Sequence, residues 1–534
     1  MAKISILKRF YPPEVKDMSA LELERKEIAE NIFVCSDSWL KKNKYGLWEM
    51  YLEGSPFDIG AKNGILTKEL AEFQEEAFIE QIRQMVPSES YLRFLKYFIG
   101  WFNRNMALHV PMEYQKEIFG ISRNASNEYN YISKPYHRIL NYHAAHDIGH
   151  ALQNMNMVYC TAFGVKNQRS SDNNMIIGRN FDLYIGDGFA ENKIVTFFNP
   201  ENGYKLSTIT WGGMIGAVSG MNEKGLTITY NSAKSDIPKS AKIPVSILAR
   251  KILQYAATID EAYEIAKSHE TFVSGSFFIA SAEENRMVVI EKTKRKIDLF
   301  ETGTNDLILT NHYQGEKLKN RDLNIQNIEE SSSMYRWERT QELLEKQETH
   351  DIHSFAEILR DQKGKNNRDI GMGNEKAVNQ LIAHHSIIFK PQELKFWVSS
   401  NPFQLGSYVA YDLNKVFSDS IDIEGDIYIE DLNIPEDDFL HSEEYQNFLV
   451  YKEKSKQFEK QLKQKKHNIE EQEILEFLKL NPEFYNTWLI AGDYYKSTGN
   501  MAEAIKHYQT ALSKEIPWKS EEEKIMKSLK KIKK

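Results

Sequence analysis

Cysteine is nearly absent from this chain of 534 residues, which holds only Cys35 and Cys160. Two thiols are too few for a disulfide framework or for a zinc site built from thiolates. We therefore expect both thiols to be free, and at least one of them to be available for chemistry. We expect no cofactor and no bound metal.

Long apolar runs and an excess of basic residues are also missing. No apolar run reaches the ~18 residues of a membrane-spanning helix, so we expect no transmembrane segment. The first residues lack the apolar core of a signal peptide, which predicts a cytoplasmic protein unless an export signal has been removed. The net charge is −8, from 68 basic and 76 acidic residues, so nucleic acid is not an expected partner.

The chain is too long for one ordinary domain, and its patterning divides it into four parts. Residues 1–159 are predicted to be largely helical. Residues 160–413 alternate short apolar runs with turns, as a β-rich domain does. Residues 414–465 form a predicted charged connector, and residues 466–534 a predicted helical module.

The N-terminal part has helical periodicity in residues 21–32, 67–85 and 91–102. The third segment carries aromatic side chains around Arg93 and Lys96. Aromatic stripes at helical spacing usually pack in a core, so we predict a buried helix. The alternative is a helix whose aromatic face contacts an acyl chain or a membrane surface.

A histidine cluster precedes Cys160. On a helix, His143, His146 and His150 would share one face, which three metal ligands could use. Gly149 interrupts this segment, however, and neither a thiolate nor the glutamate of a zinc motif is near. We therefore interpret it as a polar, hydrogen-bonded segment, in which His150 could also assist chemistry at Cys160.

The β-rich part contains many short runs of strand composition and a few helical ones. The predicted strands are residues 161–165, 175–180, 194–198, 206–211, 226–230, 276–282, 287–292, 307–310, 386–389 and 394–399. The predicted helices are residues 243–257, 260–267 and 334–346. This mixture predicts an α+β domain built in layers.

Cys160 opens a predicted hairpin, whose two strands flank the polar turn at residues 167–174. A thiol with a pKa near ~8.5 is mostly protonated at neutral pH and needs a base before it can act as a nucleophile. No histidine stands in the hairpin. Cleavage between Tyr159 and Cys160 would supply a base, because the freed α-amine has a pKa of about 7.7 to 8.0 and lies on the same residue.

The hairpin is followed by an ordered series of short motifs. Cys160-Thr161 precedes Gly178-Arg179-Asn180-Phe181-Asp182, and then come GG at 212–213, SGMNEKGL at 219–226, TYN at 229–231, LTNH at 309–312 and SMYR at 333–336, with EGSPFDIG at 53–60 and Gly64 upstream. The series resembles the N-terminal-nucleophile (Ntn) hydrolases. Its closest likeness is to the penicillin acyltransferase-like branch, which is related to choloylglycine hydrolase and acid ceramidase. The resemblance covers residues 50–413 and rests on the order of the motifs.

The resemblance implies a fold and an activation step. It implies a four-layer αββα sandwich for residues 160–413, preceded by a helical pro-segment that is cut off by autoproteolysis. Cys160 would then be the nucleophile and its own α-amine the base. Asp182 would hold that amine, and Arg179 would lie beside the sulfur and favour the thiolate. The alternatives are an Asx turn for Asp182 and a surface ion pair for Arg179.

Further residues complete the implied site. Asn231 and Asn311 follow predicted strands, where amide or backbone N–H groups can stabilise a tetrahedral oxyanion, although either could be a turn residue. Arg336 matches the late arginine of the family's site, and Arg339, one helical turn on, is its rival. His312 fits the acyltransferase-like branch, with a structural hydrogen bond as its alternative role.

These residues imply hydrolysis of a linear N-acyl amide through an S-acyl-enzyme at Cys160, so the expected partner is a small-molecule N-acyl amide. Three alternatives stay open. The acyl group could pass to an amine, as in an acyltransferase; the substrate could be an ester, as in a phospholipase B-like enzyme; or the chain could be an inactive scaffold that acts through its C-terminal helices.

The C-terminal part carries the spacing of one tetratricopeptide-like repeat. The residues that fit are Trp488, Ala491, Gly492, Tyr495, Gly499, Ala504, Tyr508 and Ala511, with Pro517 one place late. A lone helical pair cannot bury its own apolar face, so it should pack on flanking helices, on the catalytic domain or on a protein partner. We favour a C-terminal helical cap over a peptide-binding module.

Overall fold

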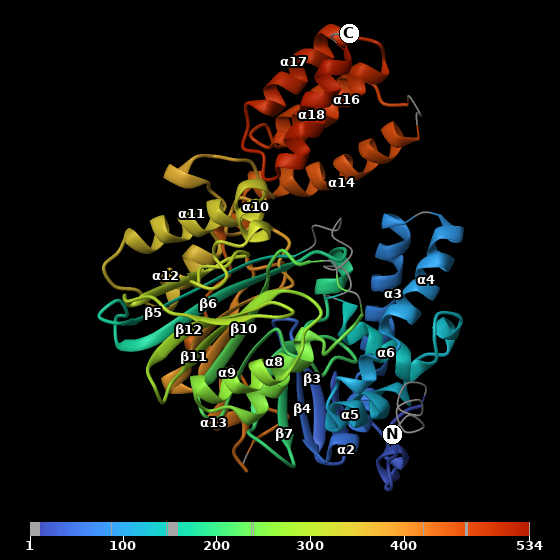
Figure 1. Cartoon of the computed structure of the whole chain (residues 1–534), viewed down its shortest axis with the longest axis vertical. Coiled ribbons are helices and arrows are strands. Elements are labelled where there is room, and N and C mark those ends of the chain that lie inside the picture. The colour runs from blue at the N-terminus through green and yellow to red at the C-terminus, as the bar shows by residue number, and fades with distance from the viewer. Residues whose placement is uncertain are drawn as a thin grey trace.

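A computed structural model of the chain describes residues 11–86, 88–145, 147, 158–236, 238, 240–419, 421–464 and 468–532. The described part is an α+β structure, as the sequence predicts. It has two β-sheets, helices on their outer faces, and a group of helices at the C-terminus that stands beside the sheets (Figure 1).

The larger sheet has eleven strands in the order β1-β2-β3-β4-β7-β8-β9-β10-β11-β12-β13, in which β4 and β7 pair parallel and the other neighbours antiparallel. These strands are β1 (Lys26–Ala29), β2 (Ile32–Cys35), β3 (Ser38–Lys42), β4 (Trp48–Gly54), β7 (Ile194–Pro200), β8 (Leu206–Thr210), β9 (Ser219–Asn222), β10 (Leu226–Ser232), β11 (Gly275–Ser281), β12 (Arg286–Lys292) and β13 (Ile297–Phe300).

The smaller sheet has six strands in the order β14-β5-β6-β15-β16-β17. They are β5 (Val158–Asn167), β6 (Asn173–Leu183), β14 (Asp306–Leu309), β15 (His385–Lys390), β16 (Lys395–Ser399) and β17 (Tyr408–Asp412). Each strand predicted between residues 160 and 413 overlaps a strand of one of the two sheets, so these predictions are confirmed.

Helices make up most of the remaining regular structure. They are α2 (Pro56–Leu66), α3 (Lys68–Met85), α4 (Glu89–Asn103), α5 (Met112–Ser122), α6 (Pro135–His143), α8 (Val245–Tyr255), α9 (Ile259–Ser268), α10 (Asp322–Glu330), α11 (Ser333–Glu345), α12 (Ile352–Leu359), α13 (Leu413–Val416), α14 (Glu443–Lys463), α15 (Glu471–Leu480), α16 (Tyr485–Ser497), α17 (Met501–Leu512) and α18 (Lys519–Ile532). The predicted helices at residues 243–257, 260–267 and 334–346 are confirmed as α8, α9 and α11.

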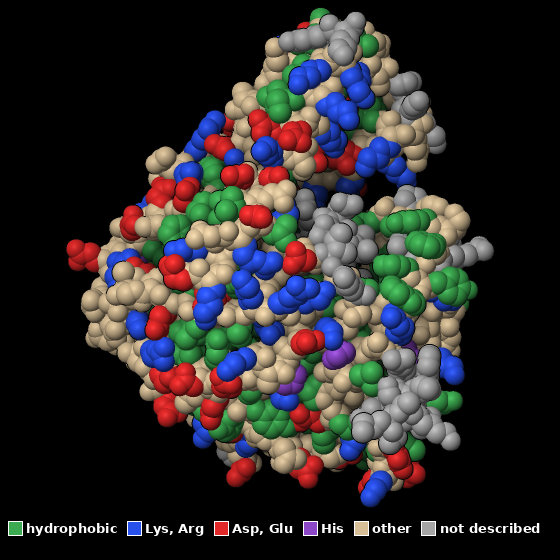
Figure 2. Space-filling model, viewed as in Figure 1, with side chains coloured by type: hydrophobic (Ala, Val, Ile, Leu, Met, Phe, Trp, Pro, Cys, Tyr) green, Lys and Arg blue, Asp and Glu red, His purple; other side chains and the backbone are tan. Residues whose placement is uncertain are grey.

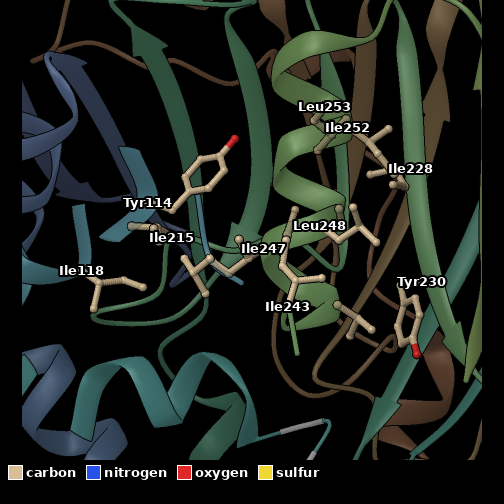
Figure 3. Close-up of a cluster of buried hydrophobic side chains, with 14 of the residues drawn as sticks. Tyr114, Ile118, Ile215, Ile228, Tyr230, Ile243, Ile247, Leu248, Ile252 and Leu253 are labelled. Carbon is tan, nitrogen blue, oxygen red and sulfur yellow. The ribbon is translucent and has the colours of Figure 1, made fainter. Parts of the chain in front are cut away.

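Three hydrophobic clusters separate four layers. In the first, Leu248 of α8 packs with Ile228 and other side chains on the outer face of the larger sheet (Figure 3). The second lies between the two sheets and includes Ile177 of β6 and Phe197 of β7. The third joins the smaller sheet to its helices, with the ring of Phe163 on β5 4.7 Å from that of Phe355 on α12. The layers therefore run helix, sheet, sheet, helix.

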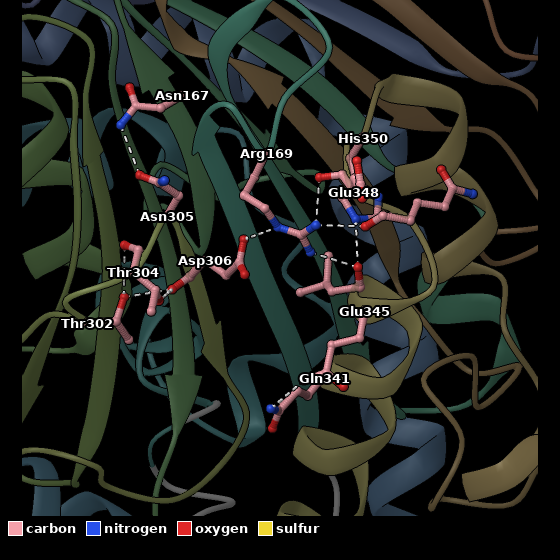
Figure 4. Close-up of polar contacts among 12 residues, drawn as sticks. Asn167, Arg169, Thr302, Thr304, Asn305, Asp306, Gln341, Glu345, Glu348 and His350 are labelled. Atoms are coloured by element: carbon pink, nitrogen blue, oxygen red, sulfur yellow. Dashed lines mark hydrogen bonds and ion pairs between the residues drawn. The ribbon is translucent and has the colours of Figure 1, made fainter.

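The turn after β5 is fastened to the end of α11 by one arginine. Arg169 donates its Nε to Asp306 at 3.0 Å and its terminal nitrogens to the backbone carbonyls of Leu344, Gln347 and Glu348 (Figure 4). A cation at a helix C-terminus also interacts favourably with the helix dipole. The hairpin β5–β6 is thereby held to the outer helix layer.

The prediction of a helix at residues 21–32 is wrong. The segment contains a short 3₁₀ turn, Ser19–Glu22, and then the antiparallel hairpin of β1 and β2. Asn31 has a left-handed backbone (φ 57°) that a helix interior does not accommodate, and β2 pairs with β3 at the end of the larger sheet. Pairing within this hairpin and with the next strand, β3, has overridden the local helical periodicity. The predicted helix at residues 67–85 is confirmed as α3.

The aromatic segment is a helix, α4, but the prediction that it is buried is wrong. The exposed fractions are 60% for Phe94, 73% for Tyr97 and 55% for Trp101, whereas Phe102 at the end of the helix is buried against Phe272. Figure 2 shows hydrophobic side chains on the surface in the region where Figure 1 places α3 and α4. Periodicity reveals an apolar face but not what covers it, so contact with an acyl chain or a membrane stays a prediction.

The C-terminal helices share one hydrophobic cluster. This cluster also includes Leu381, which precedes β15, and Leu405, which lies between β16 and β17. Within it, the ring of Tyr451 on α14 stacks on Phe477 of α15 at 5.0 Å. Gly492 of α16 lies so close to Tyr508 of α17 that a Cβ would come within 2.6 Å of that ring. The predicted helical pair is present, and its assignment as a tetratricopeptide-like repeat stays a prediction. Among the described helices, none is both long and apolar enough to cross a membrane.

Candidate active site

Cys160 lies near the start of β5, where it pairs with Phe181 of β6. Its side chain is fully buried, and it packs with Phe181, Leu183 and Val218 in a small hydrophobic cluster. The alternation of the strand turns residue 160 toward the same face as Ala162, which lies in the core between the sheets. The thiol is thus at the end of the space between the two sheets.

Arg179, two residues before Phe181 on β6, reaches the thiol. Its Nη2 lies 3.4 Å from the Cys160 sulfur and 2.5 Å from the carbonyl of Tyr230, and its Nη1 donates to Ser219 at 2.7 Å. Burial raises the pKa of the Cys160 thiol, and the positive charges of Arg179 and Arg336 oppose that rise. The predicted neighbour of the sulfur is therefore in contact with it.

Arg336, in the first turn of α11, holds the backbone of the same cysteine. Its Nη1 donates to the carbonyl oxygen of Cys160 at 2.7 Å and to the Thr161 hydroxyl at 2.9 Å. Its Nη2 donates to Asn311 at 2.8 Å. The rival, Arg339, instead forms an ion pair with Asp361 at 2.7 Å. Of these two arginines, the structure brings Arg336 to the cysteine.

Asn311 connects Arg336 to the nitrogen of the nucleophile. Its Oδ1 accepts a hydrogen bond from the backbone N–H of Cys160 at 3.1 Å as well as from Arg336. Its own amide group donates to the carbonyl of Ser232 at 2.8 Å. The nitrogen that would become the α-amine therefore already has an oriented acceptor.

Asp182, near the end of β6, carries a buried carboxylate. Both oxygens of its side chain are enclosed and have no hydrogen-bond partner among the residues that the structure describes. Burial raises the pKa of Asp182 to about 8, although Arg336 and Arg179 lower it. It lies opposite Tyr159 in the register of β5 and β6, beside the predicted cleavage site.

The amide groups of the two predicted oxyanion residues are already engaged. Asn231 Nδ2 donates to the carbonyls of Leu309 at 3.2 Å and Thr310 at 3.0 Å, while its Oδ1 is enclosed and unpaired within the described chain. Asn311 Nδ2 donates to Ser232, as described above. Both amide groups therefore donate to backbone carbonyls.

The histidines of the sequence analysis serve as hydrogen bonders where they are described. His143 Nδ1 contacts the carbonyl of Ile139 at 2.9 Å, and its Nε2 accepts from the backbone N–H of Ile215 at 3.1 Å. His312 lies 2.9 Å from the Ser333 hydroxyl. Burial lowers the pKa of each to about 4. His146 and His150 lie outside the described residues.

Within the described ranges, no group of three or more potential metal ligands is arranged to hold a metal ion.

Sequence analysis missed a polar chain behind Arg179. Ser219, to which Arg179 donates, lies 2.9 Å from Nε2 of His385, and Nδ1 of His385 lies 2.9 Å from Nδ1 of His384. Ser219 opens the SGMNEKGL motif at residues 219–226, but no role was predicted for it. The paired histidines before the apolar run of β15 were the available signal for the rest.

A pocket opens beside the cysteine cluster, between the N-terminal helices and the sheets. Phe181, Leu183 and Val218, which pack with Cys160, form part of its wall. Further lining residues come from α3 and α6 and from the loop after β8: Ala71, Phe78, Ile139, Tyr142, Trp211 and Met214. The pocket is mostly apolar, with Lys68, Glu72 and Glu75 among its charged residues.

Among curated proteins, an uncharacterized protein from Archaeoglobus fulgidus is 23% identical over 253 residues, which are 45% of this chain and 42% of the relative. The alignment thus spans less than half of that relative's length. Among solved structures, the Caenorhabditis elegans N-acylethanolamine-hydrolyzing acid amidase ortholog is 20% identical with a TM-score of 0.31, covering 44% of this chain and 93% of its own. A mutant of the conjugated bile acid hydrolase from Clostridium perfringens is 16% identical with a TM-score of 0.33, covering 51% and 95%.

A family model gives the clearest comparison. Residues 169–403 match the model described as acyl-coenzyme A:6-aminopenicillanic acid acyl-transferase. This segment holds Arg179, Asp182, Asn231, Asn311 and Arg336, and it begins just after Cys160. The resemblance inferred from the ordered motifs is therefore confirmed for this segment. Over residues 169–403 of its 534 residues, the chain is thus similar to the acyl-coenzyme A:6-aminopenicillanic acid acyl-transferase family.

Proposed function

We propose that this protein is a self-cleaving cysteine Ntn hydrolase that breaks the C–N bond of a linear N-acyl amide through an S-acyl-enzyme at Cys160. The proposal rests on one observation: three side chains each contact a different atom of Cys160. Arg179 contacts the sulfur of Cys160, Asn311 its nitrogen and Arg336 its carbonyl oxygen. A structural cysteine needs none of these contacts, whereas a nucleophile that also serves as base needs its sulfur and nitrogen oriented.

Asp182 supports the cleavage step. Within the described chain its buried carboxylate has no donor, and burial of an unpaired charge is costly. Cleavage before Cys160 would create a cationic amine across the strand pair from Asp182. The new amine would supply the partner that the carboxylate lacks, and the carboxylate would in turn set the protonation of the amine.

The reaction then follows from these groups. The α-amine takes the thiol proton, and the sulfur attacks the amide carbonyl of the substrate. The tetrahedral intermediate collapses to a thioester as the amine passes its proton to the leaving nitrogen. Water attacks the thioester, releases the acid and restores the thiol. Arg179 favours the thiolate at the start of each cycle because its positive charge lies beside the sulfur.

The pocket supports an apolar acyl group. Its lining near Cys160 is formed by Phe181, Leu183 and Val218, and Phe78 and Trp211 extend that apolar surface. Each methylene that such a surface takes from water is worth about 0.8 kcal/mol. We infer that the acyl chain, rather than the amine, occupies this pocket.

Transfer to an amine acceptor is the second candidate, and the name of the matching family favours it. Hydrolysis and transfer share the acyl-enzyme and differ in the acceptor that reaches it. The scaffold alternative has no comparable support, because a scaffold needs none of the contacts to Cys160. An ester would form the same acyl-enzyme, so the assay below separates it from an amide.

The test begins with intact mass and N-terminal sequencing of the purified protein. We expect a second chain that begins at Cys160. The cut protein is then given N-acyl amides of increasing chain length, the matched esters, and an amide together with a second amine. Amide hydrolysis supports the proposal, and an amide product with the second amine establishes transfer. Turnover of esters alone, or an uncut and inactive wild type, contradicts it.

A further inference from the structure

The residue before the nucleophile is held by two parts of the chain that are far away in sequence. Gln380, fully buried, donates its Nε2 to the carbonyl oxygen of Tyr159 at 3.4 Å. The ring of Trp518, at the start of the last helix, lies 5.0 Å from the ring of Tyr159. The carbonyl carbon of Tyr159 is the atom that the Cys160 sulfur must attack if the chain cuts itself.

Gln380 belongs to the segment 368–381, which the C-terminal helices hold in place. Glu515, just after α17, pairs with Arg368 at 2.9 Å and with Lys376 at 2.6 Å. The backbone carbonyl of Glu515 also accepts from Asn374 at 2.9 Å. One glutamate of the C-terminal module thus contacts the segment at three positions.

A second set of contacts fixes the start of the same segment. Asn481, after α15, exchanges two hydrogen bonds with the backbone of Met372, at 3.0 Å and 2.9 Å. Gly371 has a left-handed backbone (φ 82°) and lies so close to Phe484 that a Cβ would come within 2.4 Å of its nitrogen. The contact therefore requires glycine at this position.

The other side of the segment is fastened to the catalytic hairpin. Asn180 on β6 donates its amide group to the carbonyl of Val378 at 2.9 Å. Gln380 follows two residues later, and its Oε1 is enclosed without a partner in the described chain. The hairpin and the C-terminal module thus hold the segment from two sides, and Gln380 Nε2 donates to the carbonyl of Tyr159.

We propose that Gln380 is the oxyanion donor for self-cleavage, and that the C-terminal module is a positioning element for it. This inference rests on the proposed function. The amide groups of Asn231 and Asn311 are engaged elsewhere, whereas Gln380 donates to the carbonyl at which the negative charge would develop. Trp518 of the C-terminal module packs on the side chain of Tyr159, whose carbonyl this is.

The step is an N-to-S acyl shift. The Cys160 sulfur bonds to the carbonyl carbon of Tyr159, whose oxygen carries the negative charge while Gln380 donates to it. The C–N bond between residues 159 and 160 then breaks, the thiol proton moves to the departing nitrogen, and a thioester remains. Water hydrolyses the thioester, leaves a carboxylate on Tyr159 and restores the thiol of Cys160.

The test follows the appearance of the chain that begins at Cys160, starting from freshly made uncut protein. Gln380→Leu keeps the size but removes the donor, and we expect its first-order rate to fall about 100-fold or more, as for the loss of one oxyanion donor. Gln404→Leu is the matched control, because Gln404 is equally buried and its side-chain amide has no hydrogen-bond partner, Tyr159 included, among the described residues. Thermal unfolding of both variants checks that they are folded.

Gln380→Glu separates donation from packing. A carboxylate cannot donate and repels an oxyanion, so the rate should be low relative to wild type at neutral pH and approach it as acid protonates the new carboxyl. A structural role would not give this pH dependence. This variant also decides the case if Gln380→Leu does not fold.

Trp518→Leu tests the role of the C-terminal module, with Trp488→Leu as the control, because Trp488 stacks on His507 within the module. We expect slower cutting only for Trp518→Leu. If the wild type cuts and Gln380→Leu or Trp518→Leu cuts at the same rate, the corresponding part of this inference is wrong and the proposed function stands. A wild type that never cuts overturns both.

Discussion

The two cysteines of this protein are equally buried but have different surroundings. Cys35 ends β2 in the core around the larger sheet, and the nearby cation, Lys62, is already paired with Asp37 at 2.5 Å and with the carbonyl of Glu53 at 2.7 Å. Cys160 has Arg179 at 3.4 Å from its sulfur. Burial raises the pKa of both thiols. Burial alone therefore does not mark a nucleophile; a cation directed at the sulfur does.

The largest expected difference in cutting and in amide turnover is between Cys160→Ala and Cys35→Ala. Cys160→Ala should abolish both the cut before residue 160 and amide turnover, because no other group replaces the sulfur. Cys35→Ala should retain both and lose about 1 kcal/mol of stability from lost packing. Intact mass, N-terminal sequencing and a turnover assay of the two variants measure this. Equal loss in both, or in neither, would contradict the assignment of Cys160.

The second prediction compares the carboxylates near the two cysteines, Asp182 near Cys160 and Asp37 near Cys35. In the cut enzyme, Asp182→Asn should lower turnover about 100-fold, because the α-amine loses the charge that orients it. Steady-state kinetics on cut protein measure this, and Asp37→Asn beside Cys35 is the control. An Asp182→Asn enzyme with normal kcat would show that the amine is oriented by other groups.

In the uncut chain, the same carboxylate should affect stability with a definite sign. Burial raises the pKa of Asp182 from 3.8 to about 8, so the folded state binds more protons than the unfolded state between these values. Stability therefore falls as pH rises through that window. Denaturation of Cys160→Ala should show a larger fall between acidic and mildly alkaline pH than that of Cys160→Ala with Asp182→Asn. Identical pH dependence would mean that Asp182 is paired by residues outside the described chain.

The sequence was sufficient for parts of the molecule whose signals are local. Alternating apolar runs identified ten strands of the two sheets between residues 160 and 413 but missed β9, β13 and β17. The ordered motifs placed Cys160, Arg179 and Arg336 in one site before their contacts were known. Arg336 and Arg339 lie one turn apart on α11 and look alike in sequence. The structure separates them because Arg339 has Asp361 within reach.

The features that the sequence did not reveal depend on distant partners. Strands β1 to β4 pair with one another as local hairpins, and they join the rest of the larger sheet only through β4 and its partner β7, which follows much later in the chain. The aromatic face of α4 has the same periodicity whether it is buried or exposed. Gln380 and Trp518 belong to no motif, and their contacts with Tyr159 arise only when the C-terminal helices pack on residues 368–381. Long-range packing is what a single sequence does not state.

The fourth prediction uses Cys35 as an internal reference for Cys160. In the cut enzyme, Arg179→Met should raise the pKa of the Cys160 thiol, and one pKa unit corresponds to about tenfold less thiolate at neutral pH. Alkylation of Cys160 by iodoacetamide should slow accordingly, while labelling of Cys35 stays unchanged. Mass spectrometry of the two labelled peptides measures the ratio. Arg179→Lys keeps the charge and should recover part of the rate, whereas equal slowing of both cysteines would indicate a general structural change.

The smallest predicted effect concerns the pocket that adjoins Cys160. Ala71 on α3 lines this pocket, so Ala71→Phe should shorten it and exclude the end of a long acyl chain. Each excluded methylene loses about 0.8 kcal/mol, which is about fourfold in kcat/KM. Long-chain amides should therefore lose several-fold in kcat/KM, and short-chain amides should lose nothing. Ala29→Phe, at an exposed position on β1, is the control. A loss that is the same for every chain length would mean that the acyl group lies elsewhere, and that the apolar wall beside Cys160 only excludes water from the thiol.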